Sequence, residues 1–225
     1  MPGSARALVP PDESSPAPAR FAVMLSGGGR TLANLFEHIE AGRLRARVVL
    51  VIASRECPGA DLARRRGVRV AVQPGEIAAE ALAGLLTEAG AEWIVLAGYL
   101  RQVRVPPGFD GRIVNIHPAL LPSFGGAGMY GLAVHQAVLD AGCKVSGCTV
   151  HLCDAEYDRG PIVLQRTCPV EPGDTAQTLA DRVFKVERRA YPDALELLFS
   201  GRVRVDGRRT AILPDPAAPV CIART

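Results

Sequence analysis

The order of apolar segments predicts an α/β fold in which helices flank a mostly parallel sheet. From residue 21 to about residue 116, strand-like runs alternate with helical runs, and this alternation is typical of parallel sheets. A glycine turn, Gly27 to Gly29, joins the first strand-like run to the first helical run. Beyond Gly142, two adjacent strand-like runs precede one long helical run, which predicts an antiparallel C-terminal extension of this Rossmann-like sheet.

The first half of the chain supplies the parallel strands and their crossover helices. In its first helical run, apolar residues recur at helical spacing, with Thr31 placed to cap the helix and Gly42 to end it. We expect strands at residues 21–25, 48–53, 68–72, 93–97 and 113–116, and helices at residues 32–40, 61–66 and 77–89.

The second half carries fewer and longer elements. We expect strands at residues 146–153 and 162–170, a helix at about residues 175–199, and a hairpin of residues 203–205 and 210–213. Asp206-Gly207 marks the hairpin turn, which we expect at the edge of the sheet. Residues 1–20 are rich in Pro, Ala and Ser without an apolar period, so they predict a disordered tail before one domain at residues 21–225.

Composition favours a globular protein with small-molecule partners. The 225 residues are 48% hydrophobic, which is enough for a sizeable core. The net charge is only +3, and the short Arg64-Arg65-Arg66 run is typical of a solvated helix face, so we expect no nucleic-acid partner. Without an apolar span of about 20 residues or a signal-peptide pattern, we expect a cytoplasmic monomer or homodimer that contacts no membrane.

Six cysteines raise the question of a metal site. Cys143, Cys148, His151 and Cys153 lie close in the sequence, but alternation along a strand places Cys148 on one face and His151 with Cys153 on the other. The spacing matches no usual zinc pattern. We therefore expect no metal and interpret the cysteines as free thiols in a reducing compartment.

The turn Ser26-Gly27-Gly28-Gly29-Arg30-Thr31 is a candidate phosphate site. Glycines let the backbone approach an anion, and the N-terminus of the following helix offers free N–H groups. No Gly-Lys-Ser/Thr follows, which argues against a Walker loop. A dinucleotide site is only half matched, because Leu32 stands at the third glycine position, and Ser54 and Arg55 would suit NADP rather than NAD. A purely structural turn is the alternative.

Polar residues gather at the end of the strand expected at residues 113–116. Asn115 and His117 are two residues apart, so they point to the same side, and Pro118 stops the ladder. A carboxamide donor beside an imidazole suits oxyanion stabilisation and proton transfer. Asp158, in the Asp158-Arg159-Gly160-Pro161 turn, could orient or charge the imidazole. The alternative is that His117 only ends a strand and Asp158 only serves a turn.

Five motifs give the chain a resemblance to the phosphoribosylglycinamide formyltransferase family over about residues 21–205. They are Ser26-Gly-Gly-Gly, Val95-Leu-Ala-Gly-Tyr-Leu-Arg101, Asn115-Ile-His-Pro-Ala-Leu-Leu-Pro122, Gly147-Cys-Thr-Val-His151 and Asp158-Arg-Gly-Pro161. The resemblance implies the formyltransferase fold and folate-dependent formyl transfer in purine synthesis. The formyl group would pass from the cosubstrate 10-formyltetrahydrofolate to the amine of glycinamide ribonucleotide, without a metal or a covalent intermediate.

The resemblance also implies roles for residues. Residues 21–114 would form the phosphate-binding half, and residues 115–225 the catalytic and folate-binding half. Asn115 and protonated His117 would stabilise the oxyanion, while Asp158 would raise the pKa of His117 and take the amine's proton through a water. The ribonucleotide would be bound by Gly28, Gly29, Arg30, Thr31 and, at its amine end, Glu187. The formylfolate would be bound by Leu100, Arg101, Gln102, Val103, Asn115, Asp154, Ala155, Glu156, Tyr157 and Asp158.

The sequence departs from the family pattern at two places, and other functions share its motifs. Arg30-Thr31 stand where many relatives have Ser-Asn, and Arg159 replaces a glycine, which costs that loop some freedom. A formyltransferase for a sugar amine or another amine shares the same catalytic trio. Methionyl-tRNA formyltransferase and formyltetrahydrofolate deformylase share it too, but both carry a further domain that we do not expect here. A non-catalytic phosphometabolite binder needs no titratable trio, and an NADP-dependent reductase is a third alternative.

Overall fold

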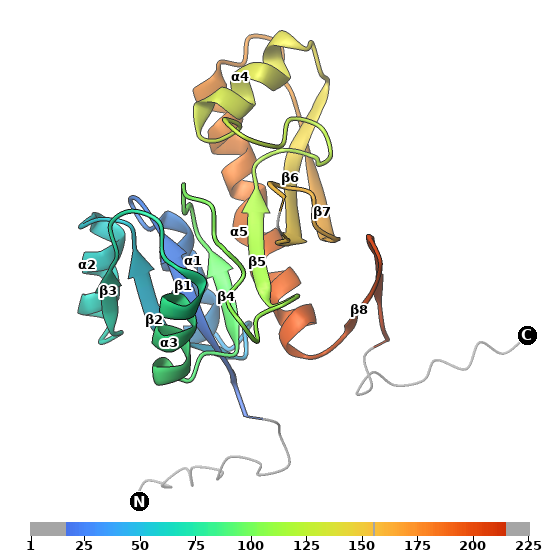
Figure 1. Cartoon of the computed structure of the whole chain (residues 1–225). Helices are drawn as coiled ribbons and strands as arrows, with labels where there is room; N and C mark the ends of the chain where they lie inside the picture. Colours follow the sequence, from blue (N-terminus) through green and yellow to red (C-terminus); the bar gives the residue numbers. More distant parts are fainter. Residues whose placement is uncertain (1–16, 155, 215–225) are drawn as a thin grey trace, which may run out of the picture.

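The computed structural model describes residues 17–154 and 156–214 and contains a seven-stranded sheet (Figure 1). The strand order is β3-β2-β1-β4-β5-β6-β7. Pairing is parallel from β3 to β5 and antiparallel between β5, β6 and β7. The predicted α/β architecture with an antiparallel extension is confirmed. The strands are β1 (Ala19–Leu25), β2 (Ala46–Ala53), β3 (Val70–Val72), β4 (Trp93–Leu96), β5 (Ile113–His117), β6 (Val145–Leu152), β7 (Ile162–Pro169), β8 (Val203–Asp206) and β9 (Arg209–Ile212).

Helices cover both faces of the parallel part, which explains why its strands are apolar along their whole length. In β1, Phe21 and Val23 pack with α1 and α5, whereas Ala22 and Met24 pack with α3 on the opposite face. Figure 1 shows α3 in front of the sheet and α1 with α5 behind it. The helices are α1 (Arg30–Glu40), α2 (Pro58–Arg65), α3 (Ala79–Ala89), α4 (Leu132–Asp140) and α5 (Ala176–Phe199).

Helix α5 links the two parts of the sheet. Pro192 has no N–H for the carbonyl of Arg188, and the Asn34 side chain of α1 donates to that carbonyl at 2.9 Å instead. The hydroxyl of the fully buried Tyr191 lies 2.8 Å from the Leu96 carbonyl of β4. It also lies 3.0 Å from a carbonyl of β5. These bonds fix α5 against the two strands whose ends form the site described below.

Element boundaries at the N-terminal side differ slightly from the prediction. Strand β1 begins at Ala19 rather than residue 21, and the Arg20 N–H donates to Glu92 Oε2 at 3.1 Å. The rest of the predicted tail, residues 1–16, lies outside the described residues. Helix α1 begins at Arg30 with Gly29 as its cap, so Thr31 lies inside the first turn and does not cap the helix.

Two features at the C-terminal side were not predicted correctly. Helix α4 follows a glycine-rich segment and has only a weak apolar stripe, so the spacing of its apolar residues did not predict a helix. Strands β8 and β9 form the predicted hairpin, but the hairpin is a separate two-stranded sheet. The Thr210 hydroxyl donates to the Ile162 carbonyl of β7 at 2.6 Å. The hairpin therefore contacts the large sheet through a side chain rather than through a backbone ladder.

Candidate active site

The predicted pair at the end of β5 faces two residues of β6. Asn115 is paired with His151 and His117 with Thr149 in the antiparallel register. Directly opposed residues share one face of a sheet. Asn115 Nδ2 lies 3.2 Å from His151 Nε2. His151 therefore belongs to the polar cluster, although the sequence analysis gave it no role.

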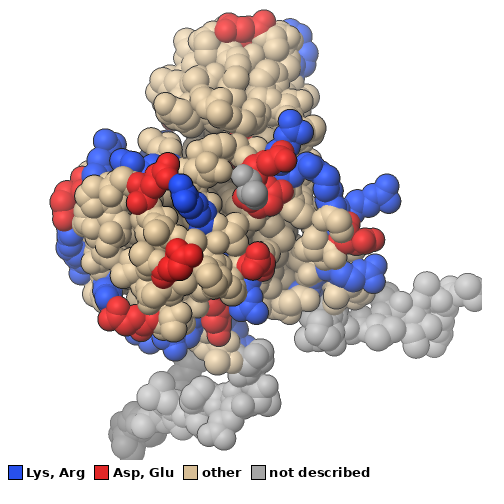
Figure 2. Space-filling model, viewed as in Figure 1, with Lys and Arg blue, Asp and Glu red and all other residues tan. Residues whose placement is uncertain are grey.

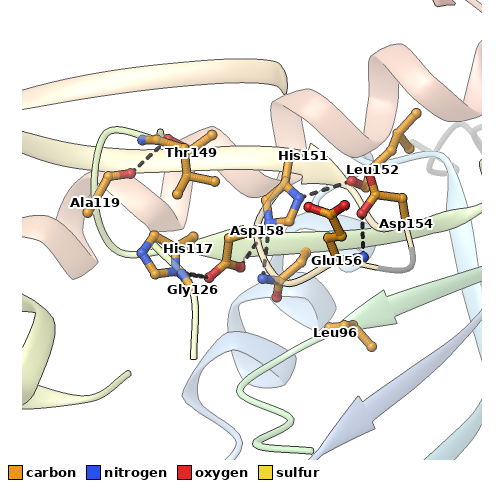
Figure 3. Close-up of polar contacts among 12 residues, drawn as sticks. Leu96, His117, Ala119, Gly126, Thr149, His151, Leu152, Asp154, Glu156 and Asp158 are labelled. Carbon is orange, nitrogen blue, oxygen red and sulfur yellow. Dashed lines mark hydrogen bonds and ion pairs between the residues drawn. The ribbon is translucent and has the colours of Figure 1, made fainter. Parts of the chain in front are cut away.

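Asp158 completes the cluster from the loop between β6 and β7. Its Oδ2 lies 3.5 Å from His117 Nδ1, and its Oδ1 lies 3.5 Å from His151 Nε2. Figure 3 shows the carboxylate between the two imidazole rings. The side chains of both histidines are almost fully buried, and that of Asp158 is 11% exposed. Charges in this cluster are sheltered from water, so they interact more strongly than they would on the surface.

Unusual backbone conformations hold the cluster in place. Phe124 and Asp158 have positive φ angles of 57° and 54°, which are uncommon for residues other than glycine. The Phe124 carbonyl lies 2.8 Å from His117 Nε2, and the Gly126 N–H donates to Asp158 Oδ2 at 2.9 Å. A Cβ atom at Gly125 would lie 3.2 Å from Asp158 Cβ. Residues 124–126 therefore fit closely around Asp158 and His117.

Burial and charge set the titration of the two groups in opposite ways. Burial lowers the pKa of His117 below its ordinary value and outweighs Asp158 and the Phe124 carbonyl, which raise it. Asp158 therefore raises the pKa of His117 as expected, although burial makes the net shift a decrease. Burial raises the pKa of Asp158, but hydrogen bonds from His151 and Gly126 and the charge of His117 bring it below its ordinary value. Asp158 is ionised at neutral pH and is a weak base.

The cluster opens into a pocket of about 700 Å³. Its wall includes all but one of the residues predicted to bind formylfolate. The exception, Ala155, lies outside the described residues. The predicted residues in the wall are Leu100, Arg101, Gln102, Val103, Asn115, Asp154, Glu156, Tyr157 and Asp158 for the folate, and Arg30, Thr31 and Glu187 for the ribonucleotide. The pocket thus brings two predicted binding sites together at the catalytic trio.

Other residues of the wall were missed by the sequence analysis. They come mainly from α4, α5 and the segment before α4, and include Met129, Tyr130, Leu132, His135, Gln177 and Phe184. Helical spacing places Gln177, Phe184 and Glu187 on neighbouring positions of one face of α5. That spacing could have connected them once Glu187 was considered a site residue.

The glycine turn combines an open part with a packed part. A Cβ atom at Gly27 or Gly28 would meet no atom within 4 Å. At Gly29, where φ is 75°, a Cβ atom would lie 2.6 Å from Gly59 Cα of α2. Gly28 and Gly29 do not appear in the pocket wall, although Arg30 and Thr31 do. Gly29 is therefore explained by helix packing, which is the structural alternative for that position.

The two residues considered for NADP binding are occupied in holding this turn. The Ser54 hydroxyl donates to the Ser26 hydroxyl at 2.8 Å, and Arg55 Nε donates to the Ser26 carbonyl at 3.0 Å. The Leu100 N–H also donates to the Ser26 hydroxyl, at 3.2 Å. Ser26 thus connects the ends of β1, β2 and β4. This arrangement gives Ser54 and Arg55 a structural explanation.

The two sequence departures have identifiable surroundings. Arg30 is the first residue of α1, and its guanidinium lies 4.3 Å from the ring centroid of Phe184 on α5. Burial raises the pKa of the nearby Glu187 to about 7, against the opposing effect of Arg30. Arg159 is not among the described residues with positive φ, so its backbone does not require glycine.

The cysteines of β6 and the following loop lie on the sides that strand alternation predicted. Cys148 lies in the hydrophobic core, whereas His151 and Cys153 line the pocket. Cys57, Cys143, Cys148, Cys153 and Cys168 are free thiols. Within residues 17–154 and 156–214, no group of three or more His, Cys, Asp or Glu is arranged to hold a metal ion. In the same part of the chain, no helix is long and apolar enough to cross a membrane.

Known proteins with similar sequences share this architecture. The family model described as formyl transferase matches residues 19–195. A chloroplastic phosphoribosylglycinamide formyltransferase from Arabidopsis thaliana is 38% identical over 205 residues, which cover 86% of this chain and 70% of that protein. The trifunctional purine biosynthetic protein adenosine-3 of Gallus gallus is 40% identical over 195 residues, which cover 83% of this chain and 19% of that longer protein.

A solved structure agrees with these sequence matches. The crystal structure of glycinamide ribonucleotide transformylase 1 from Symbiobacterium toebii matches with a TM-score of 0.80 and 39% identity. The match covers 87% of this chain and 94% of that structure. Residues 19–195, which the family model matches, include the glycine turn, the predicted catalytic trio and most of α5. The chain belongs to the formyl transferase family.

Proposed function

We propose that this protein transfers the formyl group of 10-formyltetrahydrofolate to the amine of N1-(5-phospho-D-ribosyl)glycinamide. The products are formylglycinamide ribonucleotide and tetrahydrofolate, in de novo purine (IMP) biosynthesis. One observation carries the proposal: Asn115, His117 and Asp158 line a pocket whose wall also holds most of the residues expected to bind the two substrates. The names of the relatives support the same acceptor and the transfer of a formyl group.

The two ends of the pocket suit two different ligands. At one end, Arg30 and Thr31 lie in the first turn of α1, where free N–H groups and the helix dipole favour a phosphate. In another part of the wall, Leu100 and Val103 offer apolar surface, and Asp154, Glu156 and Tyr157 line the same pocket. An apolar wall with a few polar groups is typical of sites for a flat ring system such as a pterin.

Asn115 and His117 are suited to stabilise the tetrahedral intermediate. The amine attacks the formyl carbon, and the carbonyl oxygen becomes an oxyanion that needs donors already in place. Asn115 Nδ2 lies 3.2 Å from His151 Nε2 and carries two hydrogens, so at least one of them can be directed to the oxyanion. Both ring nitrogens of His117 face oxygen atoms, of Asp158 and Phe124, and protonation of the ring would satisfy both. The oxyanion would replace the Phe124 carbonyl at Nε2.

Asp158 contributes charge rather than proton affinity. Its ionised carboxylate favours the protonated form of His117, against the effect of burial. Its lowered pKa makes it a poor proton acceptor at neutral pH.

The cellular setting is also part of the proposal. We propose a cytoplasmic enzyme, since five free thiols, including buried Cys148 and Cys168, suit a reducing compartment. Figure 2 shows acidic and basic side chains interspersed on the visible face, with few charges on the lobe that carries α4. Such a surface suits small-molecule partners rather than nucleic acid. The enzyme would act as a monomer or homodimer.

An ultraviolet assay of formylfolate consumption tests the function. The purified chain is incubated with 10-formyltetrahydrofolate alone, with glycinamide ribonucleotide, or with an amino sugar. Formyl loss that requires the ribonucleotide supports the proposal. Loss without an acceptor would indicate a deformylase, and loss with the amino sugar alone would indicate a sugar-amine formyltransferase. No consumption in any mixture, with both ligands bound, would leave a binding protein.

A further inference from the structure

A row of three residues crosses the sheet beside the catalytic cluster. In the antiparallel registers, Thr149 of β6 lies opposite His117 of β5 and also opposite Gln165 of β7. Directly opposed residues share one face of a sheet, so the three side chains lie on the same face. Neither Thr149 nor Gln165 is among the described residues that line the pocket. Any effect of these two residues on a bound substrate must therefore pass through other residues.

The Thr149 hydroxyl uses its full hydrogen-bonding capacity. A hydroxyl has one hydrogen to donate and two lone pairs that accept. This hydroxyl donates to the Ala119 carbonyl at 2.7 Å (Figure 3). It accepts from the Leu121 N–H at 3.0 Å and from Gln165 Nε2 at 2.9 Å. Thr149 and Ala119 are fully buried, so water does not substitute for these bonds if the hydroxyl is lost.

Gln165 adds a second bond to the same segment. Its Nε2 lies 2.9 Å from the Leu121 carbonyl and 2.9 Å from the Thr149 hydroxyl, and an amide nitrogen has two hydrogens to donate. The backbone of residues 119–121 is therefore held at three points, which are the Ala119 carbonyl and both the N–H and the carbonyl of Leu121. A buried network in which every member is satisfied fixes one conformation of the segment that it holds.

The anchored residues lead directly to the segment that holds the catalytic cluster. A Cβ atom at Gly125 would lie 2.5 Å from Leu121 Cδ2, so the Leu121 side chain lies close against Gly125. The backbone of residues 124–126 in turn bonds both His117 Nε2, at 2.8 Å, and Asp158 Oδ2, at 2.9 Å. Movement of Leu121 would therefore shift the groups that fix the imidazole and the carboxylate.

We propose that Thr149 and Gln165 are positioning residues, which anchor residues 119–121 and thereby hold His117 and Asp158 in the arrangement that formyl transfer requires. The proposal rests on the proposed function, because it concerns the rate of that transfer. A displacement of about 1 Å in a catalytic group can cost on the order of 100-fold in turnover, even when the altered residue is far from the chemistry. Substrate binding depends on other parts of the pocket wall, so loss of the anchor lowers kcat and leaves KM nearly unchanged.

The test removes the Thr149 hydroxyl while keeping the size of the side chain. We expect Thr149→Val to lower kcat on the order of 10- to 100-fold and to change the KM of each substrate by less than about threefold. Thr149→Ser keeps the hydroxyl, so its kcat should stay within about threefold of that of the unaltered chain. Gln165→Leu, at an exposed position, removes the bonds to Thr149 and Leu121 and should lower kcat by about three- to tenfold. This variant tests the anchor even if Thr149→Val does not fold.

Amide hydrogen exchange supplies a readout that needs no substrate. The Gly126 N–H bonds Asp158 rather than Thr149, so only movement of the segment connects its exchange to the Thr149 hydroxyl. We expect this amide to exchange on the order of tenfold faster in Thr149→Val. Thr210→Val is the matched control, because it removes a hydroxyl that donates to the Ile162 carbonyl at 2.6 Å, away from the pocket wall. It should lower stability and leave both kcat and Gly126 exchange unchanged.

Three results would overturn the proposal. The first is an unchanged kcat or an unchanged Gly126 exchange in both Thr149→Val and Gln165→Leu. The second is a loss in Thr149→Ser as large as that in Thr149→Val, and the third is an equal loss in Thr210→Val. Absence of formyl transfer by the unaltered chain would instead refute the proposed function. Faster Gly126 exchange in Thr149→Val would then still support the anchor, and unchanged exchange would refute the anchor as well.

Discussion

The glycine turn after β1 and the cluster at the end of β5 are built by different means. At the turn, backbone packing decides the structure: Gly29 lies against Gly59, and Gly27 and Gly28 leave the backbone open. At the cluster, side chains from two strands and a loop decide it, and Asp158 lies between two histidines. The three glycines of the turn leave its backbone bare, whereas the cluster depends on the identity of its side chains.

This difference explains which sequence departures the chain tolerates. A phosphate held by backbone N–H groups does not depend strongly on the adjacent side chains, so Arg30 and Thr31 can replace the residues of relatives. An oxyanion held by side-chain donors requires those particular donors, and Asn115 and His117 are present. We therefore expect substitutions at the cluster to impair turnover, and substitutions at the turn to impair binding or folding.

The largest effect is expected in the cluster. His117→Ala and Asn115→Ala each remove a donor directed at the oxyanion, which typically costs on the order of 100- to 1000-fold in turnover. Asp158→Asn keeps the shape but removes the charge that favours protonated His117, so turnover should fall while substrate binding changes little. Formyl-transfer rates and ligand titrations of the three variants measure both quantities.

A double variant shows whether the cluster acts as one unit. His117→Ala combined with Asp158→Asn should cost much less than the product of the two single losses, because both changes disable the same imidazole. Multiplicative losses would mean that the residues act independently. Near-normal turnover in either single variant would show that its residue is not needed for catalysis.

The two regions also differ in how far the sequence predicted them. Parallel strands buried on both faces are continuous apolar runs, so β1, β2, β4 and β5 could be located within a few residues. The trio was predicted too, since strand alternation placed Asn115 and His117 on one side. What escaped was the cross-strand partner His151, because its position opposite Asn115 depends on the β5–β6 register, which periodicity alone does not specify.

Most other features that the sequence did not predict lie in segments where apolar residues do not recur at helix or strand spacing. Helix α4 and residues 124–131 are held by contacts with distant parts of the chain, such as the bond from Gly126 to Asp158. Likewise, the net pKa shift of His117 depends on burial, which its neighbours in the sequence do not reveal. The close contact of Gly29 with Gly59 was not foreseen either, because it depends on the position of α2.

The second effect separates two neighbouring glycines. Gly29→Val places a β-branched side chain at a positive φ angle and against Gly59, so it should lower the free energy of unfolding by about 3 kcal/mol. A Cβ atom at Gly28 would meet no atom within 4 Å, so Gly28→Val should affect stability much less than Gly29→Val while weakening ribonucleotide binding more than folate binding. Thermal unfolding and separate titrations of the two ligands distinguish them. Equal losses of both ligands in Gly28→Val would show that the turn only supports the fold.

The third effect extends the comparison from packing to charge. Glu187 has a pKa of about 7 in the folded chain, above its ordinary value of 4.5, so the folded state binds more protons between these values. Its contribution to stability is therefore present below pH 4.5 and is lost as the pH rises to about 7. Glu187→Gln should remove this loss and raise stability at pH 8 by on the order of 2 kcal/mol. Denaturant unfolding at pH 5 and pH 8 measures the difference.

Lys185 provides a matched control on the exposed side of the same helix. Lys185→Gln should leave the difference between pH 5 and pH 8 as it is in the unaltered chain. If Glu187→Gln is equally stable relative to the unaltered chain at both pH values, the carboxyl is already solvated. In that case, the Glu187 carboxylate costs the fold no free energy at pH 8, and the glycine turn and the cluster differ in packing alone.

The smallest effect is expected away from both regions, at the start of β1. A chain that begins at Phe21 loses the Arg20 N–H bond to Glu92 and the Arg20 guanidinium bond to the Ala89 carbonyl, at 3.1 and 2.9 Å. We expect a loss of about 1 kcal/mol, or about 2–4 °C in Tm, with normal formyl transfer. A chain that begins at Ala17 keeps both bonds and should melt like the full chain. If the chain that begins at Ala17 also melts early, residues 1–16 contribute to the fold, and the prediction of a tail from their composition is wrong.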